Sequence, residues 1–170
     1  MAPLDFGFLQ RPTTYIPLLV AASINFLTLE SVATDPDYER SSLDGGDLFY
    51  ANALSFGAGV GEEALFRGWL LPALQHYTGN SMVSNGGAAT LFALAHYPVV
   101  QRPVFQLIMG AYWGYLTQSN RWSIRESIFI HTWWDVMAFL TIYQIENKKL
   151  AKIPNIEQLT LRLPPLRFSF

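Results

Sequence analysis

The stretch GEEALFRGWLL, residues 61–71, decides how this sequence folds, because it places two carboxylates and a guanidinium inside an apolar run. Charged groups held away from water are costly unless they are paired or used. On an α-helix Glu63 and Arg67 lie about 40° apart around the axis, so they can neutralise each other. Glu62 points about 100° away from Glu63 and has no cationic partner on its own helix. We therefore expect Glu62 to meet groups from another helix.

The composition favours a membrane protein. Hydrophobic residues make up 51% of the 170 residues and charged residues only 14%, whereas a soluble domain typically carries about 25% charged residues. The mean hydropathy of +0.19 is modest because both ends and the loop at residues 35–47 are polar. The length fits one domain. The sequence therefore predicts an all-α, multi-helix transmembrane bundle in a single domain, residues 1–170.

Several function classes are excluded by charge and by residue content. The formal net charge is -2 and the isoelectric point about 5.9, so no basic face indicates a nucleic-acid partner. The chain has no cysteine, which excludes disulfides, thiolate nucleophiles and cysteine-ligated metals. Residues 1–12 lack the charged-then-apolar layout of a signal peptide.

Apolar runs separated by turn residues predict the helices. Pro72 is expected to kink or break the second helix, and Ser81 is expected to cap the third. Some runs are shorter than the ~20 residues of a full span, so tilted, buried or re-entrant segments are expected. The predicted helices are residues 15–32, 48–77, 82–97, 104–117 and 123–144.

The last part of the chain, residues 146–170, is predicted to be a basic juxtamembrane tail because lysines follow the final apolar run immediately. Glu30 and Glu126 lie at helix margins, where we expect charges at the level of the membrane interface.

Two pairs of glycines are spaced for close helix packing. Gly57 and Gly61 are four residues apart, and so are Gly110 and Gly114. Small residues at this spacing let the backbone of a neighbouring helix approach. We therefore expect both pairs to lie at helix contacts.

Two histidines are candidates for chemistry. His131 and Asp135 are four residues apart on one helical face, where they can be two metal ligands or a hydrogen-bonded pair that fixes the imidazole tautomer. His96 ends an apolar helix, and taken alone it is more typical of a satisfied core histidine.

The sequence points to activated water rather than to a covalent mechanism. The nucleophile motif G-x-S-x-G and the zinc motif H-E-x-x-H are both absent. Hydrolysis by water needs a base, a group that orients the base, and donors or a Lewis acid for the oxyanion. Candidates for these places are Glu62, His96, and His131 with Asp135.

Three motifs follow one another in the chain: E-E-x-x-x-R from Glu62, F-x-x-x-H ending at His96, and H-x-x-x-D from His131. In this order they resemble the CPBP or Abi family, the intramembrane CAAX-processing and bacteriocin-processing proteases related to type II CAAX prenyl endopeptidases. The motifs lie within residues 51–138, which we expect to be the catalytic core. The resemblance implies a helical membrane bundle whose motif residues face one polar cavity.

The resemblance also implies an activity. It is an endopeptidase that cleaves a peptide or the C-terminal tail of a membrane-associated protein, inside the lipid bilayer, as a multi-pass protein of a bacterial inner membrane. Glu62 with His96 would activate the water, and Glu63 with Arg67 would support the site. His131 with Asp135 would stabilise the oxyanion.

Position 135 departs from the prenyl-protease branch, which has Asn there. An ionised Asp can only accept hydrogen bonds, so Asp135 favours orienting His131 or binding a metal. The family has been described both as metalloproteases and as metal-independent glutamate proteases. If a divalent metal such as zinc is used, its ligands would be Glu62, His96, His131 and Asp135.

Two other classes of function remain open from the sequence. One is a catalytically inactive membrane adaptor or bacteriocin self-immunity protein with the same fold. The other is a soluble helical hydrolase or a metal-binding bundle.

Overall fold

The computed structural model describes residues 2–36, 38, 40–97 and 103–151, and all regular structure in these residues is helical. The predicted all-α fold is therefore confirmed. The elements are η1 (Ala2–Leu4), η2 (Phe6–Gln10), α1 (Pro12–Ala33), α2 (Gly45–Glu63), η3 (Ala64–Leu70), α3 (Leu71–Thr78), α4 (Ser81–His96), α5 (Val104–Ser119) and α6 (Arg125–Ala151).

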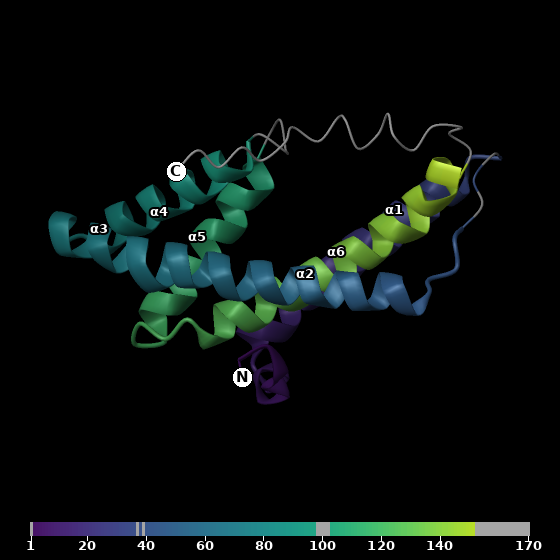
Figure 1. The fold of residues 1–170 in the computed structure, drawn as a ribbon. Coiled ribbons are helices and arrows are strands. Elements are labelled where there is room, and N and C mark those ends of the chain that lie inside the picture. Colours follow the sequence, from purple (N-terminus) through teal and green to yellow (C-terminus); the bar gives the residue numbers. More distant parts are fainter. Residues whose placement is uncertain (1, 37, 39, 98–102, 152–170) are drawn as a thin grey trace, which may run out of the picture.

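The helices form two groups joined by a long central rod (Figure 1). The rod is α2, η3 and α3, which follow one another without a break. At one end of the molecule α1 and α2 both pack against α6, and at the other end α4 packs between α3 and α5. The end of α2 and the π-helical η3 therefore lie where the two groups meet.

The predicted break at Pro72 is a change of helix type that begins before the proline. Residues 64–70 form a π-helix, in which Leu71 donates its backbone N–H to Phe66 O, five residues earlier. Proline has no N–H to donate and its ring crowds the carbonyl of the preceding turn, and here Pro72 directly follows the π-helical segment. π-Helical turns inside α-helices are frequent at functional sites.

Two predicted helix ends need correction. Asn80, not Ser81, caps α4, because its side-chain oxygen accepts hydrogen bonds from the backbone N–H groups of Met82 and Val83. Helix α6 continues to Ala151, so residues 146–151 of the predicted tail are helical. Residues 152–170 lie outside the described residues.

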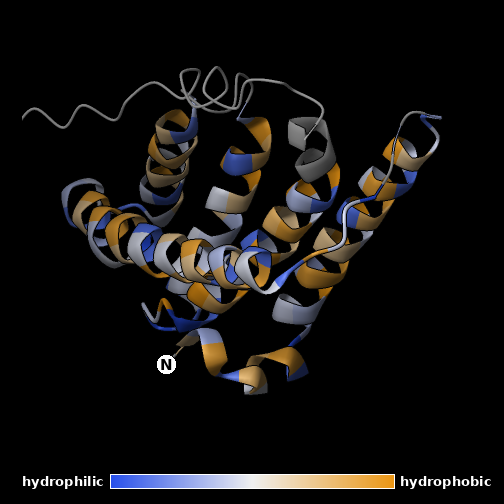
Figure 2. Ribbon diagram, turned by 45° about the vertical axis from the view of Figure 1, so that its right-hand side comes forward, coloured by the Kyte–Doolittle hydropathy of each residue, from blue (hydrophilic) through white to orange (hydrophobic). Residues whose placement is uncertain are grey.

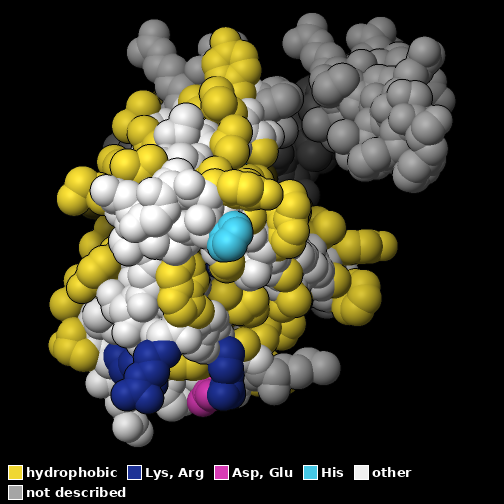
Figure 3. Space-filling view, turned by 90° about the vertical axis from the view of Figure 1, so that its left-hand side faces the viewer, with side chains coloured by type: hydrophobic (Ala, Val, Ile, Leu, Met, Phe, Trp, Pro, Cys, Tyr) yellow, Lys and Arg dark blue, Asp and Glu magenta, His cyan; other side chains and the backbone are white. Residues whose placement is uncertain are grey.

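Apolar side chains lie on the outside of the bundle and several charged ones lie inside. Hydrophobic residues run along the helices in Figure 2, and the face seen in Figure 3 is largely apolar, with basic side chains gathered along its lower edge. Leu27 is 64% exposed and Trp69 65%, whereas Glu63 and Arg67 are buried. Exposed apolar surface of this extent is typical of an interaction with lipid or protein.

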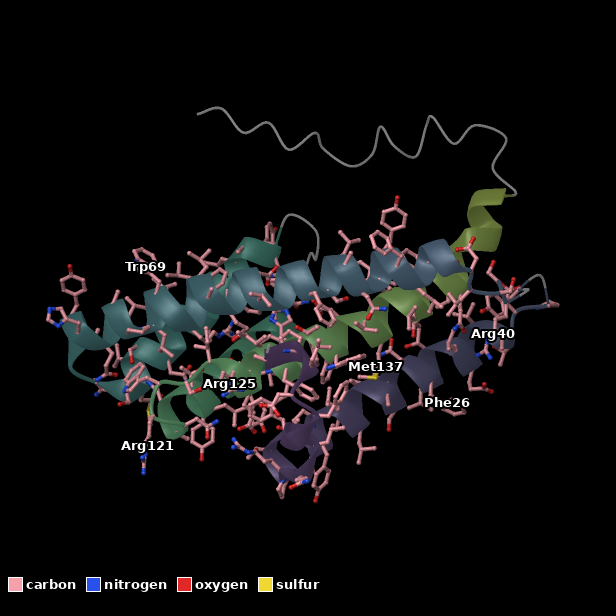
Figure 4. All side chains as sticks on the ribbon, turned by 60° about the horizontal axis from the view of Figure 1, so that its bottom comes forward. Phe26, Arg40, Trp69, Arg121, Arg125 and Met137 are labelled. Atoms are coloured by element: carbon pink, nitrogen blue, oxygen red, sulfur yellow. The ribbon has the colours of Figure 1, made fainter. Side chains whose placement is uncertain are left out.

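One described helix is long and apolar enough to cross a membrane, namely α1. Its outer side carries Phe26, while Met137 of α6 lies between α1 and α6 (Figure 4). Helices α4 and α5 have 16 residues each, or about 24 Å, which is shorter than the ~30 Å hydrocarbon core. Among the described helices, α1 is therefore the one that meets the length and hydropathy of a full span, and α4 and α5 are shorter than a span, as expected for some of the segments.

The glycine contacts are partly different from the predicted ones. A Cβ on Gly110 would lie 3.1 Å from the Phe92 ring and one on Gly114 would clash with Asn85, so this pair does allow close packing. A Cβ added at Gly57 or at Gly61 would have no neighbour within 4 Å among the described residues. The prediction that these two glycines lie at a helix contact was wrong.

Glu126 is a buried carboxylate at the start of α6, only 2% exposed. Its carboxylate accepts hydrogen bonds from Arg11 at 2.7 Å, from Thr14 at 2.9 Å and from Asn120 at 2.8 Å. A buried carboxylate is tolerated when it is paired and hydrogen-bonded. Glu126 therefore ties the start of α1 to the start of α6.

Candidate active site

The first part of the site is the predicted pair at the junction of α2 and η3. Arg67 Nη1 donates to Glu63 Oε1 at 2.8 Å, and both side chains are almost completely buried. Arg67 Nη2 donates to the backbone carbonyl of Gly110 at 3.0 Å, and the guanidinium lies 4.3 Å from the centre of the Phe92 ring. The prediction that Glu63 and Arg67 pair is confirmed, and α5 holds the arginine in place.

The same glutamate orients a histidine from α6. His131 Nδ1 lies 3.0 Å from Glu63 Oε1, and the His131 ring stacks on Trp113 with 4.2 Å between centroids. Because a carboxylate accepts hydrogen bonds, the Nδ1–H donates to Glu63 and Nε2 faces the other way. The residue that fixes the tautomer is thus Glu63 and not Asp135, whose Oδ2 lies 3.4 Å from His131 Nε2.

His96 presents the same ring atom to the site from α4. Its Nδ1 lies 2.8 Å from the Phe92 carbonyl oxygen, so Nδ1 carries the proton and Nε2 is free to accept one. Nε2 lies 3.6 Å from Glu62 Oε2. His96 is therefore held by its own helix while its reactive edge faces a carboxylate from α2.

Glu62 lies between the two imidazoles, as expected for a carboxylate without a partner on its own helix. Its Oε2 is 3.6 Å from His96 Nε2 and 3.8 Å from His131 Nε2, and it has no hydrogen-bond partner among the described residues. These separations exceed a hydrogen bond. A water molecule about 2.8 Å from Glu62 Oε2 and from one imidazole nitrogen satisfies both groups.

These groups face one cavity of about 200 Å³. A molecule of liquid water occupies about 30 Å³, so the space holds a few waters or one peptide group. The rest of its wall is mostly aromatic and aliphatic. The lining residues are Glu62, Phe92, His96, Phe105, Gln106, Met109, Trp113, His131, Trp134, Asp135 and Ala138.

The structure thus brings all six predicted site residues together. Glu62, His96, His131 and Asp135 line the cavity, and Glu63 with Arg67 lies buried behind His131. No motif in the sequence pointed to α5, which contributes Gln106 and Trp113 to the cavity wall. A glutamine within the apolar run of residues 104–113 is the signal that points to Gln106.

The predicted metal ligands do not form a metal site in this geometry. Zinc needs three or more donor atoms about 2.0–2.2 Å from one point. Among the described residues, no group of three or more His, Asp or Glu side chains is arranged in this way. The donor atoms lie 3.4 to 3.8 Å from one another, with Glu62 Oε2 near both imidazole Nε2 atoms and Asp135 Oδ2 near that of His131. The use of a metal by these residues stays a prediction.

Comparison with known proteins gives a match to a family model. The family model described as "Type II CAAX prenyl endopeptidase Rce1-like" matches residues 45–137, more than half of the chain. The matched segment begins with α2, ends within α6 and contains all six predicted site residues. No curated protein and no solved structure matches the chain.

Proposed function

The chain belongs to the Rce1-like family of type II CAAX prenyl endopeptidases, and from this premise we propose that it is a membrane-embedded endopeptidase that hydrolyses peptide bonds with water activated by Glu62 and His96. The observation that carries the proposal is Glu62 Oε2, a carboxylate oxygen without a hydrogen-bond partner among the described residues, which lies 3.6 and 3.8 Å from the Nε2 atoms of two histidines at the wall of one cavity.

The positions of Glu62 and His96 suit the activation of a water molecule. A carboxylate within reach of a water molecule accepts its proton as general base, which adds typically 10²–10⁴-fold to the rate. His96 donates its Nδ1–H to the Phe92 carbonyl oxygen, and its Nε2 accepts a hydrogen bond from that water. The site therefore orients a water molecule with two acceptors.

The proposed reaction balances within these groups. The water oxygen forms a bond to the carbonyl carbon of the substrate while its proton moves to Glu62, and the carbonyl electrons move to oxygen. The tetrahedral intermediate then collapses, the carbon–nitrogen bond breaks, and the proton on Glu62 goes to the leaving nitrogen. The products are a carboxylic acid and an amine.

The proposed substrate is a peptide, in particular the C-terminal tail of a membrane-associated protein, and the proposed location is a bacterial inner membrane in multi-pass form. Apolar side chains on the outside and charged groups inside support a membrane location. The apolar part of the cavity wall supports a substrate segment that is poor in charge.

The test is peptide cleavage by the full chain purified in detergent, with a library that includes prenylated and unprenylated C-terminal tails and mass-spectrometric product identification. We expect Glu62→Gln and His96→Gln each to lower kcat/KM by about 10²-fold or more. Glu30→Gln, on the exposed side of α1, is the matched control and should cleave like wild type. Cleavage by Glu62→Gln at the wild-type rate would exclude the mechanism and leave a non-catalytic peptide-binding protein of the same fold.

A further inference from the structure

Four side chains of the cavity that carry the proposed reaction all present acceptors to it when the imidazoles are neutral. Glu62 and Asp135 are carboxylates, and His96 and His131 each use Nδ1–H for a protein acceptor, Phe92 O and Glu63 Oε1 respectively. A tetrahedral intermediate needs hydrogen-bond donors for its oxyanion. These four side chains provide none.

Protonating His131 would give the cavity one donor, its Nε2–H. Nε2 of His131 lies 3.4 Å from Asp135 Oδ2 and 3.8 Å from Glu62 Oε2, so these two carboxylates would compete with a substrate oxygen for that proton. Oxyanion holes commonly combine several donors. A further donor in the wall of the cavity would complete such a set.

Gln106 on α5 has the free groups that are missing. Its side chain lines the cavity, its Oε1 is buried without a partner, and its Nε2 makes no hydrogen bond within the described part of the chain. An unsatisfied buried polar group in a native fold calls for a ligand, a water or a functional explanation. The side-chain amide is thus available to something that enters the cavity.

Gln106 lines the same cavity as the two carboxylates and the two histidines. Its neighbour Phe105 packs on Trp134 of α6 with 5.0 Å between ring centroids, so this part of α5 is in contact with α6. Gln106 therefore belongs to the part of the wall that α5 forms.

A primary amide matches one residue of an extended peptide. In an extended chain the N–H and the C=O of the same residue point to the same side and can bond one partner together. An amide offers the matching donor and acceptor side by side. Two tryptophans, Trp113 and Trp134, also line the cavity, and the indole Nε1 of Trp113 is buried without a partner among the described residues. An indole can donate a hydrogen bond but cannot accept one, so it matches only the carbonyl of the substrate residue.

We propose that Gln106 is a catalytic residue of the proposed peptidase, whose Nε2–H donates to the oxygen of the carbonyl under attack while its Oε1 accepts the N–H of the same substrate residue. The proposal rests on the proposed function and adds the group that stabilises the oxyanion. The Nε2–H bond strengthens as negative charge develops on the oxygen, which lowers the barrier to the tetrahedral intermediate.

The first experiment compares kinetics of wild type, Gln106→Leu and Gln118→Leu on a peptide that wild type cleaves. We expect Gln106→Leu to lower kcat by about 10²-fold, the usual loss for one oxyanion donor, with a smaller change in KM. Gln118 lies on the same helix, outside the cavity lining, where it bonds Ser81 O, so Gln118→Leu should cleave like wild type. Thermal unfolding of Gln106→Leu should be unchanged or raised, since leucine removes an unsatisfied buried oxygen.

The second experiment replaces the N–H of the substrate residue at the cleaved carbonyl with an ester oxygen. Wild type should lose about 3- to 10-fold in kcat/KM on the ester-containing peptide, the value of one hydrogen bond, and Gln106→Leu should show no further loss. Equal losses in both proteins would overturn the assignment.

The outcomes separate the two proposals. If wild type cleaves nothing, the proposed function fails and this inference fails with it. If wild type cleaves and Gln106→Leu keeps its kcat, only the role of Gln106 is wrong. If instead Trp113→Phe or Trp134→Phe lowers kcat and Gln106→Leu does not, the donor is an indole and the assignment to Gln106 is overturned.

Discussion

Glu63 Oε1 accepts hydrogen bonds from two residues at once, Arg67 in the next turn of the same rod and His131 on α6. Arg67 in turn donates to the Gly110 carbonyl of α5. A chain of contacts from the α5 backbone therefore fixes the direction of the His131 ring. This explains why two fully buried charges are tolerated here, since each is paired and hydrogen-bonded.

Removing the cation should uncover a buried carboxylate. We expect Arg67→Met to lower the free energy of unfolding by about 3–5 kcal/mol, because Glu63 stays behind without its partner. The measurement is chemical denaturation of the purified protein in detergent. The double variant Glu63→Gln with Arg67→Met should recover part of the loss, because it removes both charges. Single losses that simply add would show that the two residues do not act as a pair.

At the scale of elements, the contact of α2 with α6 depends on one glycine that the spacing pattern did not single out. A Cβ on Gly59 would lie 2.9 Å from the backbone nitrogen and 3.0 Å from the Cα of Thr132, beside the site histidine. Backbone atoms cannot rotate away as a side chain can. The crossing of α2 and α6, which brings Glu63 to His131, therefore requires glycine at position 59.

A pair of alanine substitutions tests this contact. We expect Gly59→Ala to lower the free energy of unfolding by about 1–3 kcal/mol, as overpacking does, and to reduce peptide cleavage. Gly57 is on the same helix, and a Cβ added there would have no neighbour within 4 Å. Gly57→Ala should therefore be neutral or stabilise the protein by up to ~1 kcal/mol, because alanine has a higher helix propensity than glycine. Thermal unfolding and cleavage assays of both proteins give the comparison. A Gly59→Ala protein as stable as Gly57→Ala would contradict the close approach.

The positions of the helices were predictable from the sequence, most of their ends to within a few residues. The helix type, the capping residue and one helix end were not. The apolar runs and turn residues predicted α1, the rod, α4, α5 and α6, because these signals are local. The π-helical segment, the Asn80 cap and the extension of α6 to Ala151 were missed. Each of these features depends on which partner the backbone N–H and C=O groups near a helix end bond to, and several nearby residues can be that partner.

At the scale of the whole molecule, many large apolar side chains are exposed while three charged ones, Glu63, Arg67 and Glu126, are buried. Ile24 on α1 is 45% exposed, although it is aliphatic, whereas Glu126 is 2% exposed. A soluble protein shows the opposite tendency for charged residues. The arrangement supports the proposal that lipid covers the outer face of the bundle.

Single cysteines can test this arrangement, because the chain has none of its own. We expect Ser42→Cys, in the exposed loop before α2, to react readily with a water-soluble maleimide in intact membranes. Ile24→Cys should react at least ~10-fold more slowly, since the thiolate that reacts is disfavoured in an apolar surrounding. After detergent denaturation both should label fully. Equal labelling rates in intact membranes would contradict lipid contact of α1.

The sequence by itself determined the helices and the contacts within one helix, such as Glu63 with Arg67. A spacing of four residues predicts such a contact, because residues three or four apart lie on the same face of a helix. The tertiary structure decided that Glu63 orients His131, that Gln106 enters the cavity and that Glu126 is buried. These contacts join residues far apart in the chain, and they depend on how each helix is rotated and crossed against its neighbours, which only the packing of the whole bundle sets.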